Sequence, residues 1–260
     1  MTGAHARENG GGREADSASR PPPSLSPAPA AVNRPTESAG EANANDRALA
    51  AWEIASVTLS ALIAEWVVLA LADSGARLIN SAVGLLAFAF MLLSKGARGE
   101  TARDLGFRLD NFPRAMRLLA LPTLAMTALL LLAGALAGSI NFSRWRGGWA
   151  FVGVPAFGLA WGLAQQYALQ AFVNRRAQIV CGRGARSILL VSAVFALAHF
   201  PNPALTTVTF AGGLVWSAVY QRAPNLPALA VSHALMTWVL VSTLPPHILG
   251  GLRVGYKYFV

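Results

Sequence analysis

Apolar runs of membrane-spanning length dominate this sequence from residue 50 onward, and they constrain its fold more than any other feature. They lie at 50–72, 77–94, 115–138, 149–172, 187–200, 204–220 and 226–244. A helix of about 20 apolar residues crosses the hydrocarbon core of a bilayer, where no water can satisfy an unpaired backbone. The sequence therefore predicts an all-α fold, a polytopic transmembrane helix bundle of about seven spans, with six and eight as the alternatives.

The placement of charge supports this prediction. Only 13% of the residues are charged, whereas soluble domains carry about a quarter. The net charge is +9, and the Lys and Arg residues fall in short stretches between the apolar runs. Cytoplasmic loops that face anionic lipid have this pattern, and it lacks the aromatic-interleaved basic patch of a nucleic-acid surface. We therefore expect the lipid bilayer as a partner and no nucleic acid.

The first 47 residues differ in composition from the rest. They are rich in Gly, Ala, Ser and Pro, and include the run Pro21-Pro22-Pro23. Such a segment buries too little apolar surface to offset its ordering entropy. The sequence predicts a disordered tail at 1–47 and a transmembrane helical domain at 48–260. Because the tail lacks the apolar core of a signal peptide, we expect the first run to act as an uncleaved signal anchor.

Two connections between the apolar runs are rich in arginine, at 95–114 and 173–186, whereas the alternate connections hold few basic residues. The positive-inside rule then predicts a multi-pass protein of the cell membrane, plasma or inner, with both connections and the N-terminus in the cytoplasm. The single cysteine, Cys181, lies in the second connection and excludes an internal disulfide framework.

Several polar side chains interrupt the apolar runs. They are Glu65, Gln165, Gln166, Gln170, His199, His233 and Thr237. Polar groups inside a span are costly and usually face the protein interior. Helical spacing of four puts some of them on common faces, as in the pair Gln166 and Gln170. We expect three polar stripes to meet in one buried site, and the alternative is that they only join helices through hydrogen bonds.

The stretch 149–243 carries three short motifs in a fixed order. They read Gln165-Gln166-x-x-x-Gln170, Phe195-x-x-x-His199 and His233-x-x-x-Thr237. In order and spacing they resemble the CPBP family of intramembrane proteases, which includes the type II CAAX prenyl endopeptidases and the Abi-type bacteriocin-immunity proteins. The family pattern is Glu-Glu-x-x-x-Arg, then Phe-x-x-x-His, then His-x-x-x-Asn.

The resemblance implies endopeptidase cleavage of membrane-associated or lipidated peptide substrates within the bilayer. In the family a glutamate and a histidine activate water, and another histidine with an asparagine holds the developing oxyanion. By motif position, Gln165 and Gln166 replace the two glutamates. Gln170 replaces the arginine, Thr237 replaces the asparagine, and His199 and His233 are retained.

The replacements bear directly on catalysis. Glutamine has no titratable carboxylate, so Gln165 cannot take a proton from water, and general-base assistance is typically worth about 10²–10⁴-fold in rate. Two anions and one cation have become three neutral amides, which predicts a site re-matched as a neutral hydrogen-bonded network. Glu65, an acid well inside a predicted span, is the candidate for a substitute carboxylate.

Three functions stay open on the sequence alone. The first is an active endopeptidase, with His199 as sole base or with Glu65 as its carboxylate. The second is a catalytically inactive pseudoprotease that binds a membrane-associated or lipidated partner. The third is a transporter-like or purely structural membrane protein. No cofactor is expected, and a metal is disfavoured because catalytic zinc usually takes three protein ligands.

Overall fold

The computed structural model describes residues 35–71, 76–142 and 150–260, and its described secondary structure is helical. The helices are α1 (Pro35–Leu62), α2 (Leu69–Leu71), α3 (Ala76–Ala97), α4 (Phe112–Leu136), α5 (Ala150–Gln166), α6 (Arg175–Cys181), α7 (Ala185–Leu197), α8 (Pro203–Arg222) and α9 (Leu226–Thr243). Residues 41–260 form one compact unit, which holds the helix bundle. The all-α helical fold predicted from the sequence is confirmed.

Two π-helical segments join neighbouring helices. Ile63–Val68 connects α1 to α2, and Tyr167–Asn174 connects α5 to α6. Single π-turns within α-helices are rare and frequently occur at functional sites. Glu65 lies on the first segment and Gln170 on the second, so both segments carry residues that the sequence singled out.

Two boundaries differ from the sequence prediction. Helix α1 begins at Pro35, ahead of the expected boundary at residue 47, because the Ala- and Glu-containing stretch before the apolar run can propagate a helix once the run has nucleated it. The predicted loop at 173–186 is also wrong in its first half. The helix continues through α6 to Cys181, and Arg176 is buried there rather than exposed in a loop, because acidic partners surround its guanidinium.

Three helices in the described part of the chain are long and apolar enough to cross a bilayer: Glu41–Leu71, Phe112–Leu136 and Leu226–Thr243. Only 11% and 17% of the first two apolar windows are buried, against 56% of the third. The first two therefore turn apolar surface outward, as lipid-facing helices do, while α9 is central. Two shorter apolar helices, Ser81–Ala97 and Ala185–Leu197, accompany them. The fold is that of a membrane helix bundle, and the count of about seven spans stays a prediction.

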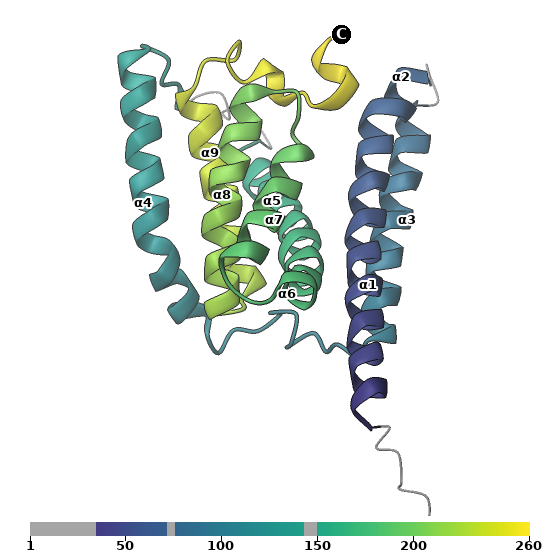
Figure 1. Ribbon diagram of the computed structural model, residues 1–260. Helices are drawn as coiled ribbons and strands as arrows, with labels where there is room; N and C mark the ends of the chain where they lie inside the picture. Colours follow the sequence, from purple (N-terminus) through teal and green to yellow (C-terminus); the bar gives the residue numbers. More distant parts are fainter. Residues whose placement is uncertain (1–34, 72–75, 143–149) are drawn as a thin grey trace, which may run out of the picture. The chain divides into compact units, whose positions relative to one another are not determined.

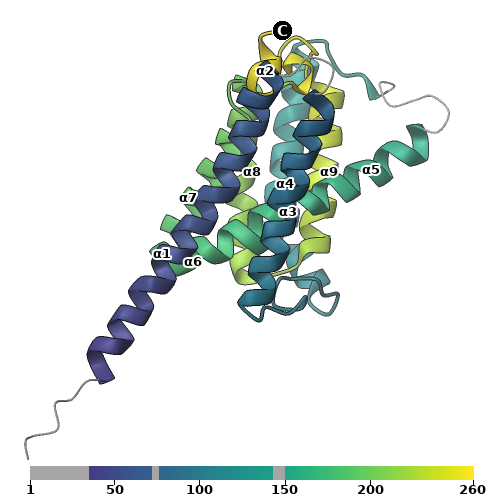
Figure 2. The ribbon, with the colours of Figure 1, turned by 90° about the vertical axis from the view of Figure 1, so that its right-hand side faces the viewer.

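Helix α9 is at the centre of the packing. It lies between α4 and α5, and α7 packs along α8 (Figure 1). The π-helical segment after α1 packs on α3 and on the C-terminal residues instead. Figure 2 shows these C-terminal residues at the same end of the molecule as α2. The molecule thus has a main bundle and, beside it, the pair α1 and α3.

Two asparagines begin α8 and α9 in the same way. Asn202 accepts a hydrogen bond from the backbone N–H of Leu205 at 3.1 Å, and Asn225 accepts one from Ala228 at 2.8 Å. In both helices a proline follows in the first turn, where its missing N–H costs nothing. These caps set the starting points of the helices that carry Trp216 and His233.

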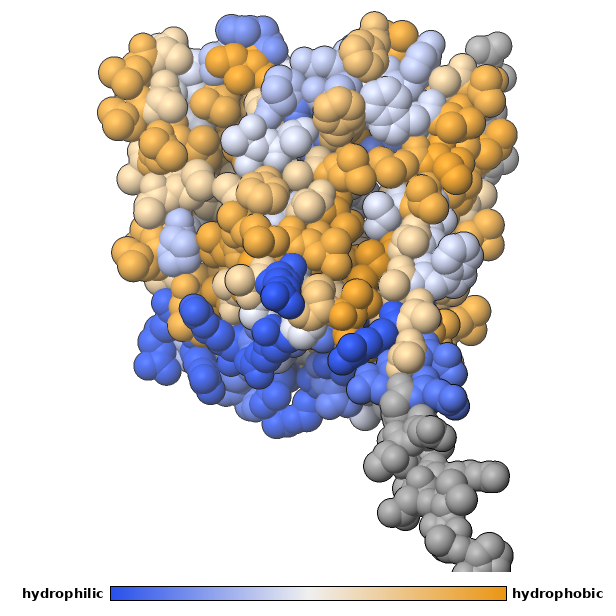
Figure 3. Space-filling model, viewed as in Figure 1, coloured by the Kyte–Doolittle hydropathy of each residue, from blue (hydrophilic) through white to orange (hydrophobic). Residues whose placement is uncertain are grey.

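The two arginine-rich stretches lie at one end of the bundle. The backbone N–H of Leu226 donates to the carbonyl of Gly106 at 2.9 Å, and Arg175 bonds to Glu100 at 2.7 Å. The connection between α3 and α4 is therefore tied to both α6 and the start of α9. Hydrophilic residues gather at this end, whereas apolar side chains cover most of the visible surface above it (Figure 3).

Candidate functional site

A cavity of about 510 Å³ lies between α1 with its π-helical segment and the main bundle. Its wall is mostly apolar and is built by α1 with its π-helical segment, α4, α5, α7, α8, α9 and C-terminal residues. The sequence-predicted residues in the wall are Glu65, Gln165, His199, His233 and Thr237. Protein sites for small molecules and peptides often have this volume and this mixture of apolar wall and few polar groups.

His199 follows the last turn of α7 and faces the cavity. Its Nδ1 lies 2.8 Å from the carbonyl oxygen of Phe195. A carbonyl can only accept, so Nδ1 carries the hydrogen, and in the neutral ring Nε2 keeps a free lone pair. The ring of Phe195 meets the imidazole edge-on at 4.8 Å between centroids. The carbonyl and the ring of Phe195 therefore fix the orientation of the His199 ring, and Nε2 can accept a proton.

His233 on α9 has the opposite arrangement of ring hydrogens. The amide nitrogen of Gln166 donates to His233 Nδ1 at 3.1 Å, which leaves Nε2 as the N–H donor of the neutral ring. Trp216 stacks on the imidazole at 4.7 Å with an interplanar angle of 13°. A Cβ added to Gly162 would lie only 3.3 Å from the carbonyl of Ala230, so a glycine at this position lets α5 approach α9 closely. The site thus holds one ring acceptor and one ring donor.

Glu65 enters the cavity from the π-helical segment after α1. Its Oε2 atom is buried without a hydrogen-bond partner, and the same is true of Oε1 of Gln165. A buried unsatisfied oxygen is costly. In native proteins, such atoms often mark a position that a substrate group or a water occupies. Both orphaned oxygens belong to side chains that line the cavity.

Gln170 does not belong to this cavity. Its amide nitrogen donates to Ser217 at 3.2 Å, and its oxygen accepts from Asn174 at 2.7 Å. Asn174 in turn accepts from Gln221 at 3.0 Å, and Gln221 also donates to Ser187. These buried residues form a separate amide network between the π-helical segment, α7 and α8.

The expectation of one neutral network through all three motif glutamines is therefore wrong. Gln166 pairs with His233, Gln170 joins the amide network, and Gln165 leaves its oxygen unpaired. The π-helical turn that begins at Tyr167 rotates the later residues away from the face that carries Gln165. Spacing of four on a regular helix could not predict this change of face.

Sequence reasoning missed the rest of the amide network, although a signal was present. Gln166, Gln170, Asn174 and Gln178 recur at a spacing of four, and the stripe continues past the apolar run. Gln178 donates to the Asn174 side chain at 3.1 Å. Asn174 and Gln178 lie in the stretch predicted as a basic loop, so the sequence indicated that their side chains face solvent.

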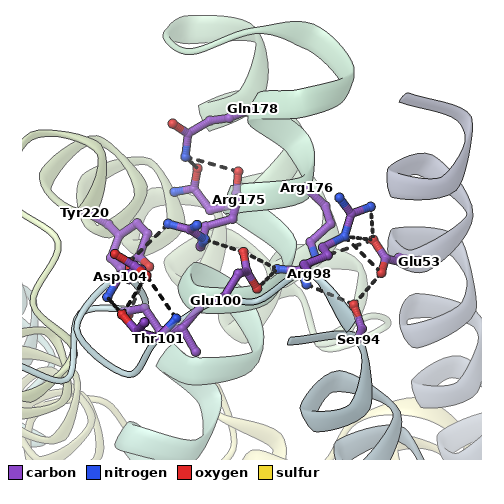
Figure 4. A network of polar contacts seen from close by, with 12 residues as sticks. Glu53, Ser94, Arg98, Glu100, Thr101, Asp104, Arg175, Arg176, Gln178 and Tyr220 are labelled. Carbon is purple, nitrogen blue, oxygen red and sulfur yellow. Dashed lines mark hydrogen bonds and ion pairs between the residues drawn. The ribbon is translucent and has the colours of Figure 1, made fainter. Parts of the chain in front are cut away.

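A second missed feature is a cluster of ion pairs at the arginine-rich end (Figure 4). The guanidinium of Arg176 is 2.9 Å from Glu100 and 3.5 Å from Glu53. Arg98 is 2.8 Å from Glu53, and Ser94 also donates to that carboxylate. The cluster joins α1, α3, the following connection and α6, so it holds the pair α1 and α3 against the main bundle.

The guanidinium pKa values at this end reflect the pairing. Burial alone would lower the pKa of Arg98, but its hydrogen bonds to Glu53 and Asp46 outweigh burial and raise that pKa above its ordinary value. Burial alone would also lower the pKa of Arg175. Its hydrogen bond to Glu100 outweighs that effect, so the pKa of Arg175 is raised. Both side chains therefore stay charged, as a structural ion-pair cluster requires.

Among the described residues, no three His, Cys, Asp or Glu side chains lie close enough to hold a metal ion. The polar side chains in the cavity wall include one carboxyl group, two imidazoles, one amide and several hydroxyls. These groups can accept a proton, donate a hydrogen bond and hold a polar group in apolar surroundings.

Comparison with known families gave one match. Residues 149–239 match the family described as Type II CAAX prenyl endopeptidase Rce1-like. This part of the chain is therefore similar to the CAAX protease family, which confirms the resemblance read from its motifs. Comparisons with curated proteins and with solved structures gave no match.

Proposed function

We propose that this protein hydrolyses peptide bonds of membrane-associated or lipidated substrates in the cavity, with Glu65 as the carboxylate that its motif lacks. The observation that carries the proposal is the position of Glu65 in the wall that also holds His199, His233 and Gln165. Gln165 cannot accept a proton. Glu65 offers a carboxylate with an unpaired oxygen from a different helix.

The two histidines take complementary parts in this proposal. Nε2 of His199 has a free lone pair because Nδ1 is bonded to the Phe195 carbonyl, so it can accept a proton from water together with Glu65. Nε2 of His233 carries a hydrogen because Gln166 occupies its Nδ1, so it can donate to the oxyanion that forms when water adds to the carbonyl. Thr237 is the further hydroxyl on the same wall.

The apolar wall favours a substrate that reaches the site from lipid. A chain segment with apolar side chains or an attached lipid gains free energy by leaving water or headgroups for this space. The arginine-rich stretches share one end of the bundle, which supports a cytoplasmic location for that end and for the N-terminus in a cell membrane.

A second candidate is an inactive protein that binds such a partner without cutting it. It is favoured by the neutral motif, in which Gln165 and Gln166 stand where the family has glutamates, and by the absence of any hydrogen bond on Glu65 Oε2. A third, transporter-like or structural role rests only on the apolar cavity.

The test uses the full chain in nanodiscs with a fluorescent, prenylated, tetrapeptide-ended peptide as substrate. Glu65→Gln keeps the shape of the side chain and removes the proton acceptor, so we expect turnover to fall by about 10²–10⁴-fold while peptide binding changes little. Glu41→Gln is the matched control, because Glu41 is exposed on the same helix.

Each result decides between the candidates. Cleavage that His199→Ala abolishes and Glu65→Gln leaves intact would show that His199 acts alone. Peptide binding without cleavage by the unmodified protein would favour the inactive partner-binding role. Restoring Gln165→Glu in a Glu65→Gln background should recover part of the activity if the two carboxyl positions are interchangeable.

A further inference from the structure

The C-terminal residues 249–259, which we call the strap, fold back over one end of the cavity. They follow α9 and contain two short 3₁₀ turns, Gly250–Leu252 and Gly255–Tyr258. Leu252 and Val254 form part of the cavity wall. The strap lies at the end of the molecule opposite the arginine-rich end (Figure 1).

One side of the strap is bonded to the segment that follows His199. The buried side chain of Asn202 donates to the carbonyl oxygens of Leu249, at 2.8 Å, and Arg253, at 3.1 Å. The backbone N–H of Gly255 donates to the carbonyl oxygen of Phe200 at 3.0 Å. The turn carrying His199 and the strap therefore form one hydrogen-bonded unit.

The other side of the strap is pressed against the helix that carries Glu65. A Cβ on Gly255 would lie 2.6 Å from the carbonyl oxygen of Glu65 and 2.8 Å from its Cβ, and Gly255 has φ +56°. Only glycine fits this close approach. The ring of Phe259 lies 6.2 Å from Trp66, which itself stacks on Phe200 at 6.1 Å.

The strap thus touches both elements that bring Glu65 and His199 to the cavity. At the opposite end the ion-pair cluster of Arg176, Glu53 and Glu100 holds the same two parts of the protein together. The helix that carries Glu65 is therefore attached to the main bundle at both ends of the cavity, by the strap at one end and by the ion-pair cluster at the other.

We propose that the strap is a positioning element that holds the Glu65 helix against the His199 turn and closes the cavity at that end. This inference rests on the proposed function in one respect, which is the catalytic role assigned to Glu65. The clamping itself is a statement about distances, so it can be measured without any cleavage.

Two substitutions perturb the strap at its two anchors. Gly255→Leu places a side chain against the Glu65 backbone. Its matched control is Gly251→Leu, because Gly251 has a similar φ of +62° but meets only the Arg253 side chain, at 3.9 Å. Asn202→Ser is the second variant: serine can still cap α8 but is too short to reach the strap carbonyls.

The readout is the distance between spin labels on the outward faces of α1 and α7, at Leu59→Cys and Leu197→Cys in a Cys181→Ser background. Both positions are exposed and lie outside the cavity wall. For the full chain in nanodiscs, we expect Gly255→Leu and Asn202→Ser to give a longer and broader distance distribution, and Gly251→Leu to match the parent.

Unchanged distances in both anchor variants would overturn the proposal, and so would an equal change in the Gly251→Leu control, since strain alone would then explain the effect. A lengthening confined to the two anchor variants supports the clamp even if the parent protein cleaves nothing, in which case the proposed hydrolysis fails alone. If the parent does cleave, its turnover should fall together with the lengthening.

Discussion

Arg176 offers a sharp test of how α6 is held in the bundle. Its side chain is 1% exposed and lies 2.9 Å from Glu100. It donates to Ser94 at 2.9 Å and its guanidinium lies over the ring of Phe172 at 4.4 Å. Arg176→Met keeps most of the aliphatic stem and the contact with Phe172 but removes the cation from the cluster.

The expected loss of unfolding free energy follows from the burial of Arg176. Removing one partner of a buried ion pair typically costs about 3–5 kcal/mol, because the other charge stays buried without compensation. Here Glu100 keeps Arg175 and Glu53 keeps Arg98, so we expect the lower end, about 3 kcal/mol of unfolding free energy. Arg175→Met is the matched control. Its side chain is 33% exposed and shares Glu100, so water reaches it and we expect a loss closer to the roughly 0–1 kcal/mol of exposed pairs.

Equilibrium unfolding of the full chain in detergent micelles, followed by far-ultraviolet circular dichroism, measures both variants. The reasoning is refuted if the losses for Arg176→Met and Arg175→Met agree within about 1 kcal/mol. The double variant Glu53→Gln with Arg176→Met should lose less than the sum of the two single variants, because it leaves fewer buried charges unpaired.

Four further outcomes follow from the structure. Asn225→Ala removes the cap of α9, and we expect unfolding free energy to fall by about 1–2 kcal/mol in the same assay. Gln170→Leu breaks the amide network and should cost about 1–3 kcal/mol because buried partners lose their bonds, with little effect on peptide binding. Cys181 should resist a membrane-impermeant thiol reagent in intact cells and react after permeabilisation; strong labelling of intact cells would reverse the proposed orientation. The hydrogen bond from Arg108 lowers the pKa of Asp110 to about 2. The stability that this pair contributes is therefore fully present above the ordinary aspartate pKa, and it is lost as the pH falls through about 2. An Asp110 carboxyl resonance that titrates near pH 4 would contradict the lowered pKa.

The sequence alone predicted the all-α membrane helix bundle. Its apolar runs leave helices as the available fold, because a bilayer offers no partner for a free backbone. The motif spacing identified His199 and His233, and the structure places both in one cavity wall. The fold prediction succeeded because it depends on the length and apolar composition of single helices, which neighbouring residues determine. The roles of the two histidines stay a prediction.

Only the tertiary structure decided which faces meet. It brought Glu65 to the cavity from a distant helix, turned Gln170 away into an amide network, and buried Arg176 among carboxylates. The spacing of residues on a helix tells which side chains share a face, but it does not tell which neighbour that face contacts. A π-helical turn changes the face without any strong sequence signal, and a buried charge is stable only beside partners that long-range packing supplies.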